Sequence, residues 1–468
     1  MQRPRRGSSS ARRPKRADGL LYVVAVAAVA GCFPFGGEEC VEPPLPPPID
    51  EALSPIARAL RYLQSTQLKS DQQLAYAQDW RGNWPQCVTL DGSGIFVRDV
   101  SPFMGTFIHH ALTLIVEENR FCLKLAPSDI DGARSMRRAA VEMMLRFEAG
   151  PDRPDAGTFG FWPELRPDRP IGHSLLSWVL APVASGPFLH GSRVPVNIWI
   201  FPQHLQLPSD ADDTAVAYAV LLDHQVLDGG GEVTRGFERF FADWRDLGQV
   251  PRRNHPDWLA PNSGAYLTWL NYGENPEDAR DNDVDVGVNA NILYALGRYG
   301  KLDTVGVGEA IGVINAAVQA DLHPFEPFGF TLYYPDNLAV HYCVARAYRE
   351  GGVAELAPAA EVLVSDLIEL AQCDEAGRCH WDRGHPHLNT AFAVLALMEA
   401  GYRGELVDDG IAYLLAEQDA DSGAWKPGVF FGARLDDGTL GFWVSAALTT
   451  AMALEALARY GLIAEGMW

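Results

Sequence analysis

The chain has 468 residues, of which 47% are hydrophobic and 21% are charged, a composition typical of a globular protein with a sizeable buried core. Its formal net charge is -22, which argues against nucleic acid or a broad anionic membrane surface as a partner. The length fits two or three average domains, or one large ring of helices.

Residues 1–31 have the layout of an export signal. A basic stretch is followed by an apolar run, Leu20 to Ala30, that is shorter than a membrane span. The end of this run, Ala30-Gly31-Cys32, resembles a bacterial lipobox, which implies cleavage before Cys32 and attachment of lipid to it. An ordinary signal peptide or a short anchor is the alternative. We expect an exported protein, lipid-anchored in the bacterial cell envelope.

A proline-rich stretch makes residues 32–50 a stiff, extended tether. Over residues 51–468, Ala- and Leu-rich amphipathic segments alternate with loops that contain Gly, Pro and Trp, and no sustained strand is predicted. We therefore expect one all-α domain, in which twelve helices close an (α/α)6 toroid of paired inner and outer helices. The predicted helices lie near residues 51–67, 103–118, 131–148, 213–225, 234–246, 286–299, 307–320, 338–350, 356–371, 388–401, 407–417 and 444–460.

Three aspartates, Asp210, Asp212 and Asp213, open one of these helices, shortly after the aromatic residues Trp199 and Phe201. One Asp would be a good helix cap, but three within four residues are more than capping needs. In an enclosed site, neighbouring carboxylates raise the pKa of at least one of them. The neutral carboxylic acid that results is a proton donor.

Capping remains the alternative explanation of these aspartates. Short polar phrases recur at other predicted helix starts, at residues 288–291, 389–391 and 449–451, and each precedes an Ala- and Leu-rich run. In that case the three aspartates belong to a structural repeat in which a small polar residue caps each inner helix. The sequence alone leaves both explanations open.

A repeat built on Gln and Trp is clearest near the C-terminus, where Tyr413-Leu414 is followed by Gln418, Gly423 and Trp425. The Gln side chain can satisfy backbone groups at a helix end while the Trp stacks over it, which fastens an outer helix to the next part of the ring. Looser copies contain Tyr62-Leu63 with Gln67, Gly82 and Trp84, and Gln372 with Gly377 and Trp381.

These motifs resemble the terpenoid cyclase and protein prenyltransferase superfamily of α/α toroids. Residues 210–215 are similar to the acid motif of class II terpene cyclases and squalene-hopene cyclases, and the Gln/Trp repeats are similar to their QW motifs. The resemblance implies a toroid over about residues 50–465. It also implies that Asp212 protonates an alkene, with Asp210 and Asp213 tuning its acidity. Class II enzymes typically use two helical domains, whereas this chain provides one toroid.

A second polar constellation, residues 281–291, stands at a later predicted helix start and includes Asp283, Asp285 and Asn289. It lacks the Gly and the terminal Glu of a calcium-binding EF-hand loop. We expect a substrate-binding patch that faces the same opening as Asp212. Solvated helix capping is the alternative.

Further residues expected at the substrate are aromatic or titratable and lie near helix starts. Tyr333, Tyr334 and His341 surround one such start, although a lone His is more often a core residue than a catalyst. Aromatic rings could stabilise a cationic isoprenoid, stack on sugars, or simply pack in the core. The aromatic candidates are Trp162, Trp199, Phe201, Trp258, Trp269, Tyr294, Tyr333, Tyr334 and Trp443.

The cysteines suggest a small disulfide loop between Cys373 and Cys379 if the protein is exported, with Cys122 and Cys343 buried and reduced. No zinc-type spacing, phosphate-binding loop, dinucleotide fingerprint or Ser/His/Asp set is present. An aspartate-rich magnesium motif for diphosphate departure is also absent. We therefore expect chemistry that starts with protonation and needs no metal or cofactor.

Three functions fit these features. The first is isoprenoid cyclisation that begins with protonation by Asp212, on a small-molecule or lipid-like substrate. The second is a carbohydrate-active toroid that pairs Asp212 with a carboxylate from residues 281–285. The third is a tethered binding or scaffold protein without catalysis.

The lipid anchor gives a direct test. Cells grown with labelled palmitate should incorporate the label into the wild-type protein and not into Cys32→Ala, because the lipobox assigns the lipid to that thiol. Gel autoradiography of the immunoprecipitated protein measures this. Equal labelling of the two proteins would contradict lipidation at Cys32.

Overall fold

The computed structural model describes residues 53–69, 81–90, 96–99, 101–118, 125–151, 155–161, 188–189, 209–228, 236–252, 254–270, 282–320, 331–335, 337–434 and 440–466. The expected signal segment (1–31) and tether (32–50) lie outside these ranges, as do Cys32, Cys122, Trp162, Trp199 and Phe201. The described part is mostly helical, as the sequence predicts.

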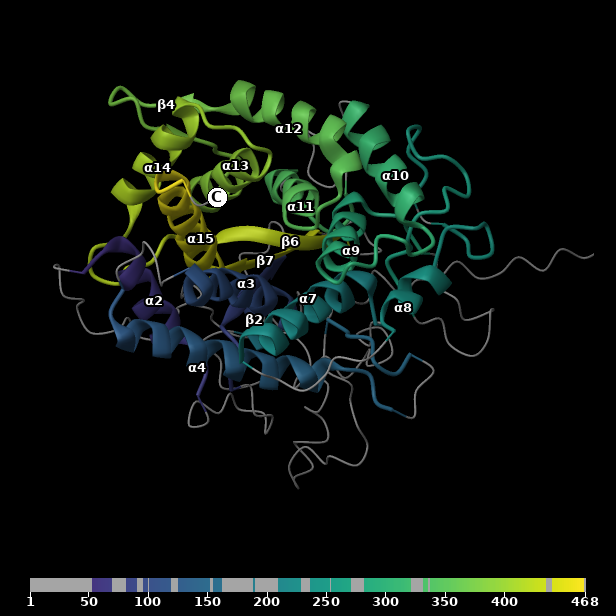
Figure 1. Cartoon of the computed structure of the whole chain (residues 1–468), viewed down its shortest axis with the longest axis horizontal. Coiled ribbons are helices and arrows are strands. Elements are labelled where there is room, and N and C mark those ends of the chain that lie inside the picture. The colour runs from purple at the N-terminus through teal and green to yellow at the C-terminus, as the bar shows by residue number, and fades with distance from the viewer. Residues whose placement is uncertain are drawn as a thin grey trace, which may run out of the picture.

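A ring of packed helices forms the centre of the molecule (Figure 1). Each helix of the ring contacts the next one along the chain, and the last, α15, packs back against the first, α3. Several are buried on all sides: in α13, every residue from His387 to Glu399 is buried. Such helices are apolar all round because they have no solvent-facing side. The ring consists of α3 (Pro102–Glu118), α7 (Ala211–Asp228), α9 (Val286–Arg298), α11 (Asn337–Arg349), α13 (Pro386–Glu399) and α15 (Ala446–Ala464).

A second set of helices packs outside this ring and alternates with it along the chain (Figure 1). These helices bury one face only; in α12, for example, the buried residues are Ala359, Ala360, Leu363 and Leu367. The spacing places them on one stripe of the helix, the pattern of an amphipathic surface helix. The set comprises α2 (Pro55–Thr66), α4 (Pro127–Met144), α8 (Glu238–Asp243), α10 (Val307–Gln319), α12 (Ala357–Leu370) and α14 (Glu405–Glu417), with the short 3-10 helices η1 (Leu145–Phe147) and η5 (Ala354–Leu356).

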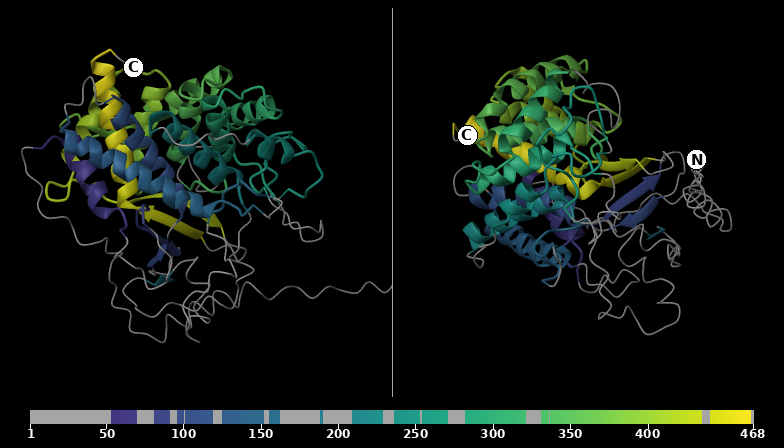
Figure 2. Two further views of the ribbon diagram at one scale, coloured as in Figure 1. Left: turned by 60° about the horizontal axis from the view of Figure 1, so that its bottom comes forward. Right: turned by 90° about the vertical axis from the view of Figure 1, so that its right-hand side faces the viewer.

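A five-stranded antiparallel sheet within the described residues corrects the all-α expectation. Its order is β3-β2-β1-β7-β6, and it lies on one side of the helices (Figure 2). The strands were missed because they are short and sit in segments that read as loops between helices, below the length at which a two-residue alternation is convincing. They are β1 (Gln86–Leu90), β2 (Phe96–Asp99), β3 (Phe188–Leu189), β6 (Gly428–Arg434) and β7 (Leu440–Ser445).

The sheet is continuous with the ring. Strand β7 leads directly into α15, and Ser445 at this junction caps the helix, because its hydroxyl accepts a hydrogen bond from the Leu448 N–H at 3.3 Å. A separate two-stranded ribbon, β4 (Gln372–Cys373) and β5 (Cys379–His380), is closed by a disulfide between Cys373 and Cys379, which confirms the expected loop. Cys343 is buried and reduced, also as expected.

Three tryptophans from the Gln/Trp segments make the same contact. The indole N–H of Trp84, Trp381 and Trp425 donates to a carbonyl near the end of an outer helix, on Leu63, Leu367 and Leu414, at 2.9, 2.7 and 2.8 Å. Each indole thereby donates to a carbonyl in the last turn of its helix, where partners inside the helix run out; the Leu63 carbonyl also accepts from the Gln67 N–H at 3.0 Å. All three tryptophans are buried.

The glutamines of two of these segments join neighbouring outer helices. Gln418, at the end of α14, donates to the Pro55 carbonyl of α2 at 2.9 Å and accepts from the Arg58 guanidinium. Gln67, at the end of α2, donates to the Met136 carbonyl of α4 at 2.9 Å. Gln372 of the third segment is instead exposed in β4.

We expect Gln418→Ala to lower the free energy of unfolding by about 1–3 kcal/mol, because the carbonyls and the guanidinium that it bonds are left without it in a buried place. Urea unfolding followed by circular dichroism measures the change. The matched control is Gln319→Ala, on an exposed residue at the end of α10, which should stay within about 0.5 kcal/mol of the wild type. Equal stability of both variants would contradict the joining role.

Candidate active site

The three aspartates at the start of α7 have different surroundings. Asp210 is the helix cap: its Oδ1 accepts a hydrogen bond from the Asp213 N–H at 2.7 Å. All three side chains are buried. The capping explanation is therefore correct for Asp210, and the other two need a separate account.

The polar phrases at helix starts do form a structural repeat. The hydroxyls of Thr214, Thr390 and Thr450, in α7, α13 and α15, each accept a hydrogen bond from a backbone N–H of a preceding loop, at 2.9, 3.1 and 3.2 Å. The donors are Phe159, Trp381 and Trp425. The repeat thus explains the threonine at the starts of α7, α13 and α15. The phrase at residues 288–291 has no threonine, and there the Asn289 Oδ1 accepts a hydrogen bond from the Tyr266 N–H at 3.1 Å.

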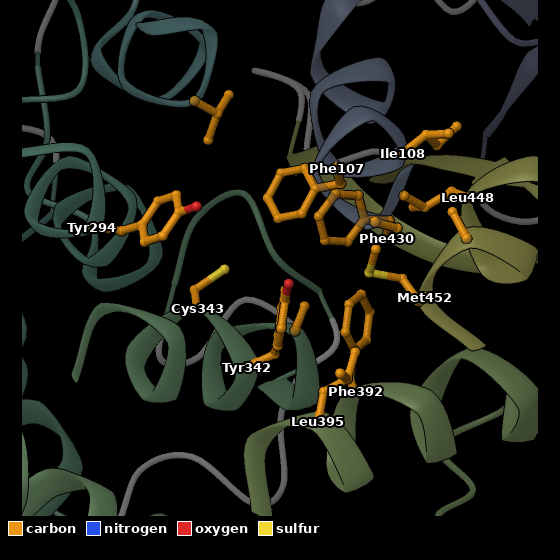
Figure 3. Close-up of a cluster of buried hydrophobic side chains, with 14 of the residues drawn as sticks. Phe107, Ile108, Tyr294, Tyr342, Cys343, Phe392, Leu395, Phe430, Leu448 and Met452 are labelled. Atoms are coloured by element: carbon orange, nitrogen blue, oxygen red, sulfur yellow. The ribbon is translucent and has the colours of Figure 1, made fainter. Parts of the chain in front are cut away.

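The same alignment separates Asp212 from capping. Asp212 stands two residues before Thr214, and the residues two before Thr390 and Thr450 are Leu388 and Leu448, both fully buried. Figure 3 shows Leu448 within the central apolar cluster. An apolar side chain serves this position in two other ring helices, so the structural repeat does not require the carboxylate of Asp212.

Two neighbouring elements supply hydrogen bonds to Asp212. The Asn291 side-chain amide on α9 donates to its Oδ1 at 2.8 Å, and the Tyr334 hydroxyl, from the segment before α11, donates to its Oδ2 at 2.6 Å. Asn291 also donates to the Tyr334 oxygen at 2.9 Å. Asp212 keeps 8% of its surface exposed, whereas Asn291 and Tyr334 have none.

Burial raises the pKa of Asp212 to about 7; the hydrogen bond from Tyr334 opposes this rise, and the charge of Asp210 adds to it. Burial likewise raises the pKa of Asp210 to about 6 and that of Asp213 well above its usual range, the latter with help from Asp210. Near pH 7, burial therefore favours the neutral form of Asp213 and leaves Asp212 about half protonated, while Asp210 is mostly ionised.

The second acidic constellation is bonded within the protein. Asp283 accepts from the Thr268 and Tyr333 hydroxyls at 2.5 and 2.8 Å. Asp285 caps α9 through the Val288 N–H and also accepts from Thr331 and Leu332. The alternative of a solvated cap is wrong in its solvation: Asp285 does cap α9, but Asp283 and Asp285 are at most 1% exposed.

Two further predicted residues also have structural contacts. Asn289 is fully buried and bonds both the N–H and the carbonyl of Tyr266. His341 is buried and lies 3.9 Å from Asp366 on the outer helix α12. His341 therefore faces an outer helix, which is the core role that the sequence left open.

Aromatic rings cluster beside Tyr334. Its ring centroid lies 6.3 Å from Phe103 and 5.8 Å from Phe430, and Phe103 and Phe430 stack at 5.6 Å. Phe431 connects this group to Trp443, with 5.0 Å between centroids. Figure 3 shows Phe430 of β6 pointing into the apolar cluster between the ring helices. Of the predicted aromatic residues, Tyr334 and Trp443 belong here, while Tyr333 contacts Trp269.

Sequence reasoning included Asn291 in the constellation at residues 281–291 without assigning it a contact, and it missed Arg346 and the phenylalanines of α3 and β6. The Arg346 guanidinium on α11 donates to the Asn291 Oδ1 at 2.7 Å. A signal existed for the two polar residues, because Asn and Arg are rare on fully buried helices unless they are partnered. The phenylalanines of β6 gave none, because that strand was not predicted, and those of α3 look like ordinary core residues of a predicted helix.

Neither a metal centre nor a membrane span is found among the described residues. No group of three or more His, Cys, Asp and Glu side chains there could hold a metal ion. No helix in those same ranges is long and apolar enough to cross a bilayer.

Comparison with known proteins gives structural matches only. No protein-family profile and no curated protein sequence matches the chain. The type II terpene cyclase MstE from Scytonema, solved in its apo form, is similar with a TM-score of 0.47 and 14% identity, over 87% of this chain and 97% of that one. A protein from Actinoplanes is similar with a TM-score of 0.48 and 14% identity, over 88% and 99%.

The raised pKa of Asp212 predicts a specific pH dependence of stability. Between the ordinary Asp value of 3.8 and about 7, the folded protein keeps a proton that the unfolded chain has lost. Stability from this group is therefore full below pH 4 and is lost as the pH rises through 7. Asp212→Asn has no proton to lose at this position, so its stability should not fall in this way. Between pH 3.8 and about 7, its free energy of unfolding relative to that of the wild type should therefore rise by up to about 1.4 kcal/mol per pH unit.

Urea unfolding at several pH values between 4 and 8 measures this difference. Gln319→Ala, a change of an exposed residue that removes no titratable group, is the control and should run parallel to the wild type. If Asp212→Asn also ran parallel, the pKa of Asp212 would not be raised.

Proposed function

We propose that this protein is a class II terpene cyclase-like enzyme, in which the helical ring is an (α/α)6 toroid and Asp212 is the general acid. The observation that carries the proposal is a buried carboxyl with a pKa near 7 at a position where two other ring helices have leucine. Proton transfer from Asp212 to an alkene carbon would form a carbocation, and attack by further double bonds would close the rings. The last cation would then lose a proton to water, and solvent would return a proton to Asp212.

The surroundings of Asp212 suit a proton donor. An acid with a pKa of about 7 is roughly half protonated at neutral pH, so the donor form is available without a cofactor. After transfer, the hydrogen bonds from Asn291 and Tyr334 would stabilise the carboxylate that remains. The charge of Asp210 would help to keep the pKa of Asp212 raised.

The aromatic cluster would stabilise the cation. Tyr334 contacts both Asp212 and the rings of Phe103 and Phe430, so π-faces begin directly beside the acid. A cation over such a face gains about 0.5–2 kcal/mol per ring when it is desolvated. Trp443, joined through Phe431, would extend this surface.

The carbohydrate alternative is less well supported. A glycosidase needs a second carboxylate that can act on water or on the sugar. Asp283 and Asp285 are the candidates, but both oxygens of each already accept hydrogen bonds from the protein. A non-catalytic binding or scaffold protein would have no use for a neutral acid at Asp212.

The proposed location follows from the expected lipid on Cys32. A toroid tethered to the bacterial cell envelope would meet lipid-like isoprenoids at the membrane surface. Its partners would then be a small-molecule or lipid-like substrate and the membrane, through the anchor alone.

The test is Asp212→Asn, which keeps the shape of the side chain and removes its acidic proton. We expect purified wild-type protein to convert at least one acyclic isoprenoid, from a panel between farnesol and squalene, into a cyclic product detected by gas chromatography and mass spectrometry. Asp212→Asn should lose that activity by at least about a hundredfold, the usual contribution of general acid catalysis.

Two control variants separate the alternatives. Asp129→Asn removes a buried carboxyl outside the site and should keep the activity. Asp283→Asn removes the candidate glycosidase carboxylate, and loss of glycan cleavage in this variant and in Asp212→Asn would favour the carbohydrate function. Full cyclase activity in Asp212→Asn would contradict the role of Asp212 as the acid.

A further inference from the structure

A buried arginine stands behind the amide that bonds Asp212. The Arg346 guanidinium on α11 donates to the Asn291 Oδ1 at 2.7 Å, and the Asn291 Nδ2 donates to the Asp212 Oδ1 at 2.8 Å. Arg346 is 2% exposed. Three helices, α11, α9 and α7, thus contribute one residue each to a chain of hydrogen bonds that ends at Asp212.

Aromatic rings, and not a carboxylate, hold the guanidinium in place. Its central carbon lies 4.7 Å from the ring centroid of Phe107, 4.1 Å from that of Tyr294 and 5.2 Å from that of Tyr342. Within the described ranges, no carboxylate forms an ion pair with Arg346, although Glu350, which pairs with Arg459, attracts it from farther away. A cation without a directly paired anion is costly to bury, and the aromatic cage, the Asn291 oxygen and the charge of Glu350 offset that cost.

The direction of the hydrogen bonds follows from the chemistry of arginine. A guanidinium only donates, so the side of the Asn291 amide that faces Arg346 has to be the oxygen. The two N–H groups of that amide then point away from Arg346, one to Asp212 and one to the Tyr334 oxygen. Tyr334 donates in turn to the Asp212 Oδ2, so every bond of the network runs toward Asp212.

We infer that Arg346 is a positioning residue for Asp212: it prevents the Asn291 amide from turning over. A reversed amide would present its oxygen to Asp212, accept the acidic proton and stabilise the neutral acid. With Arg346 in place, the amide can stabilise only the carboxylate, and the proton of Asp212 stays available for transfer. The role of this proton in catalysis rests on the proposed function, whereas the orientation of the amide does not.

Other charged or titratable groups also face Asp212. They are Asp210 and Asp213 on its own helix, Asp285 before α9, Tyr334 before α11, and Cys343 on α11. Of these groups, Cys343 and Tyr334 also hydrogen-bond the Asn291 side chain. A test of Arg346 therefore has to separate its effect through Asn291 from a change in the charge around Asp212.

A double-mutant cycle makes this separation. The pKa of Asp212 is measured by NMR with carboxyl-labelled aspartate, and Asp212→Asn assigns its signal. Arg346→Met should raise that pKa by about one unit, because the freed amide can turn over. In an Asn291→Leu background the same change should have much less effect, since no amide remains to be oriented. An equal rise in both backgrounds would mean that Arg346 acts by charge alone and would overturn the inference.

Three further measurements complete the design. Arg346→Lys keeps a donor-only cation and should restore most of the wild-type pKa. Arg137→Met, at a buried arginine on the outer helix α4, should leave the pKa of Asp212 unchanged. If Arg346→Met fails to fold, the wild type still decides the matter. The Asn291 side-chain amide protons should shift with the titration of Asp212, and signals that do not respond would overturn the inference.

Activity measurements then distinguish the two proposals. If the wild type converts an isoprenoid, Arg346→Met should lower kcat and move the pH profile upward with the pKa of Asp212. If no isoprenoid is converted but the double-mutant cycle shows coupling, the proposed function fails and the positioning role stands. If an isoprenoid is converted but the double-mutant cycle shows no coupling, the proposed function stands and the positioning role of Arg346 fails.

Discussion

The constraint on which this structure depends is that a closed ring of helices buries its own helix starts. The first N–H groups of a helix have no partner within it, and water cannot supply one inside the ring. The chain solves this with side chains: Asp210, Asp285 and Ser445 cap α7, α9 and α15. The start of a ring helix is thus where a polar residue is already tolerated. An additional carboxyl group such as that of Asp212 can find hydrogen-bond donors there, although its burial raises its pKa.

Electrostatics then give that carboxylate a special character. Three neighbouring aspartates in a buried place cannot all be ionised, so at least one of them keeps its proton. Asn291 and Tyr334 donate to Asp212 and partly offset this effect, which leaves its pKa near neutrality instead of far above it. The pKa of Asp212 depends on which end of the Asn291 amide faces it, and Arg346 hydrogen-bonds the oxygen at the other end of that amide.

A separate buried network lies toward the other ends of the ring helices. Arg459 of α15 bonds Glu455 on its own helix, contacts Glu399 of α13 at 3.3 Å and pairs with Glu350 after α11, while His110 of α3 lies 3.3 Å from Glu350. Buried ion pairs contribute little net stability, but breaking one is costly because a charge is left unpaired. This network therefore fixes the register of four helices against each other. It also contains more carboxyl groups than cations, since Glu350, Glu399 and Glu455 surround Arg459 and His110, and burial raises the pKa of Glu399 well above its usual range.

The sequence by itself determined the helices of the ring, the disulfide loop and the cluster of carboxylates. Apolar periodicity and Ala-rich runs are local, and so is the spacing of Cys373 and Cys379 or of Asp210, Asp212 and Asp213. The short strands were not predictable, because their pairing partners lie far apart in the chain: Val88 pairs with Trp443 across the sheet. For the same reason, only the tertiary structure decided which of the three aspartates is a cap and which is a candidate acid. That decision depends on Asn291, Tyr334 and Arg346, which come from other helices and reach Asp212 only when the ring closes.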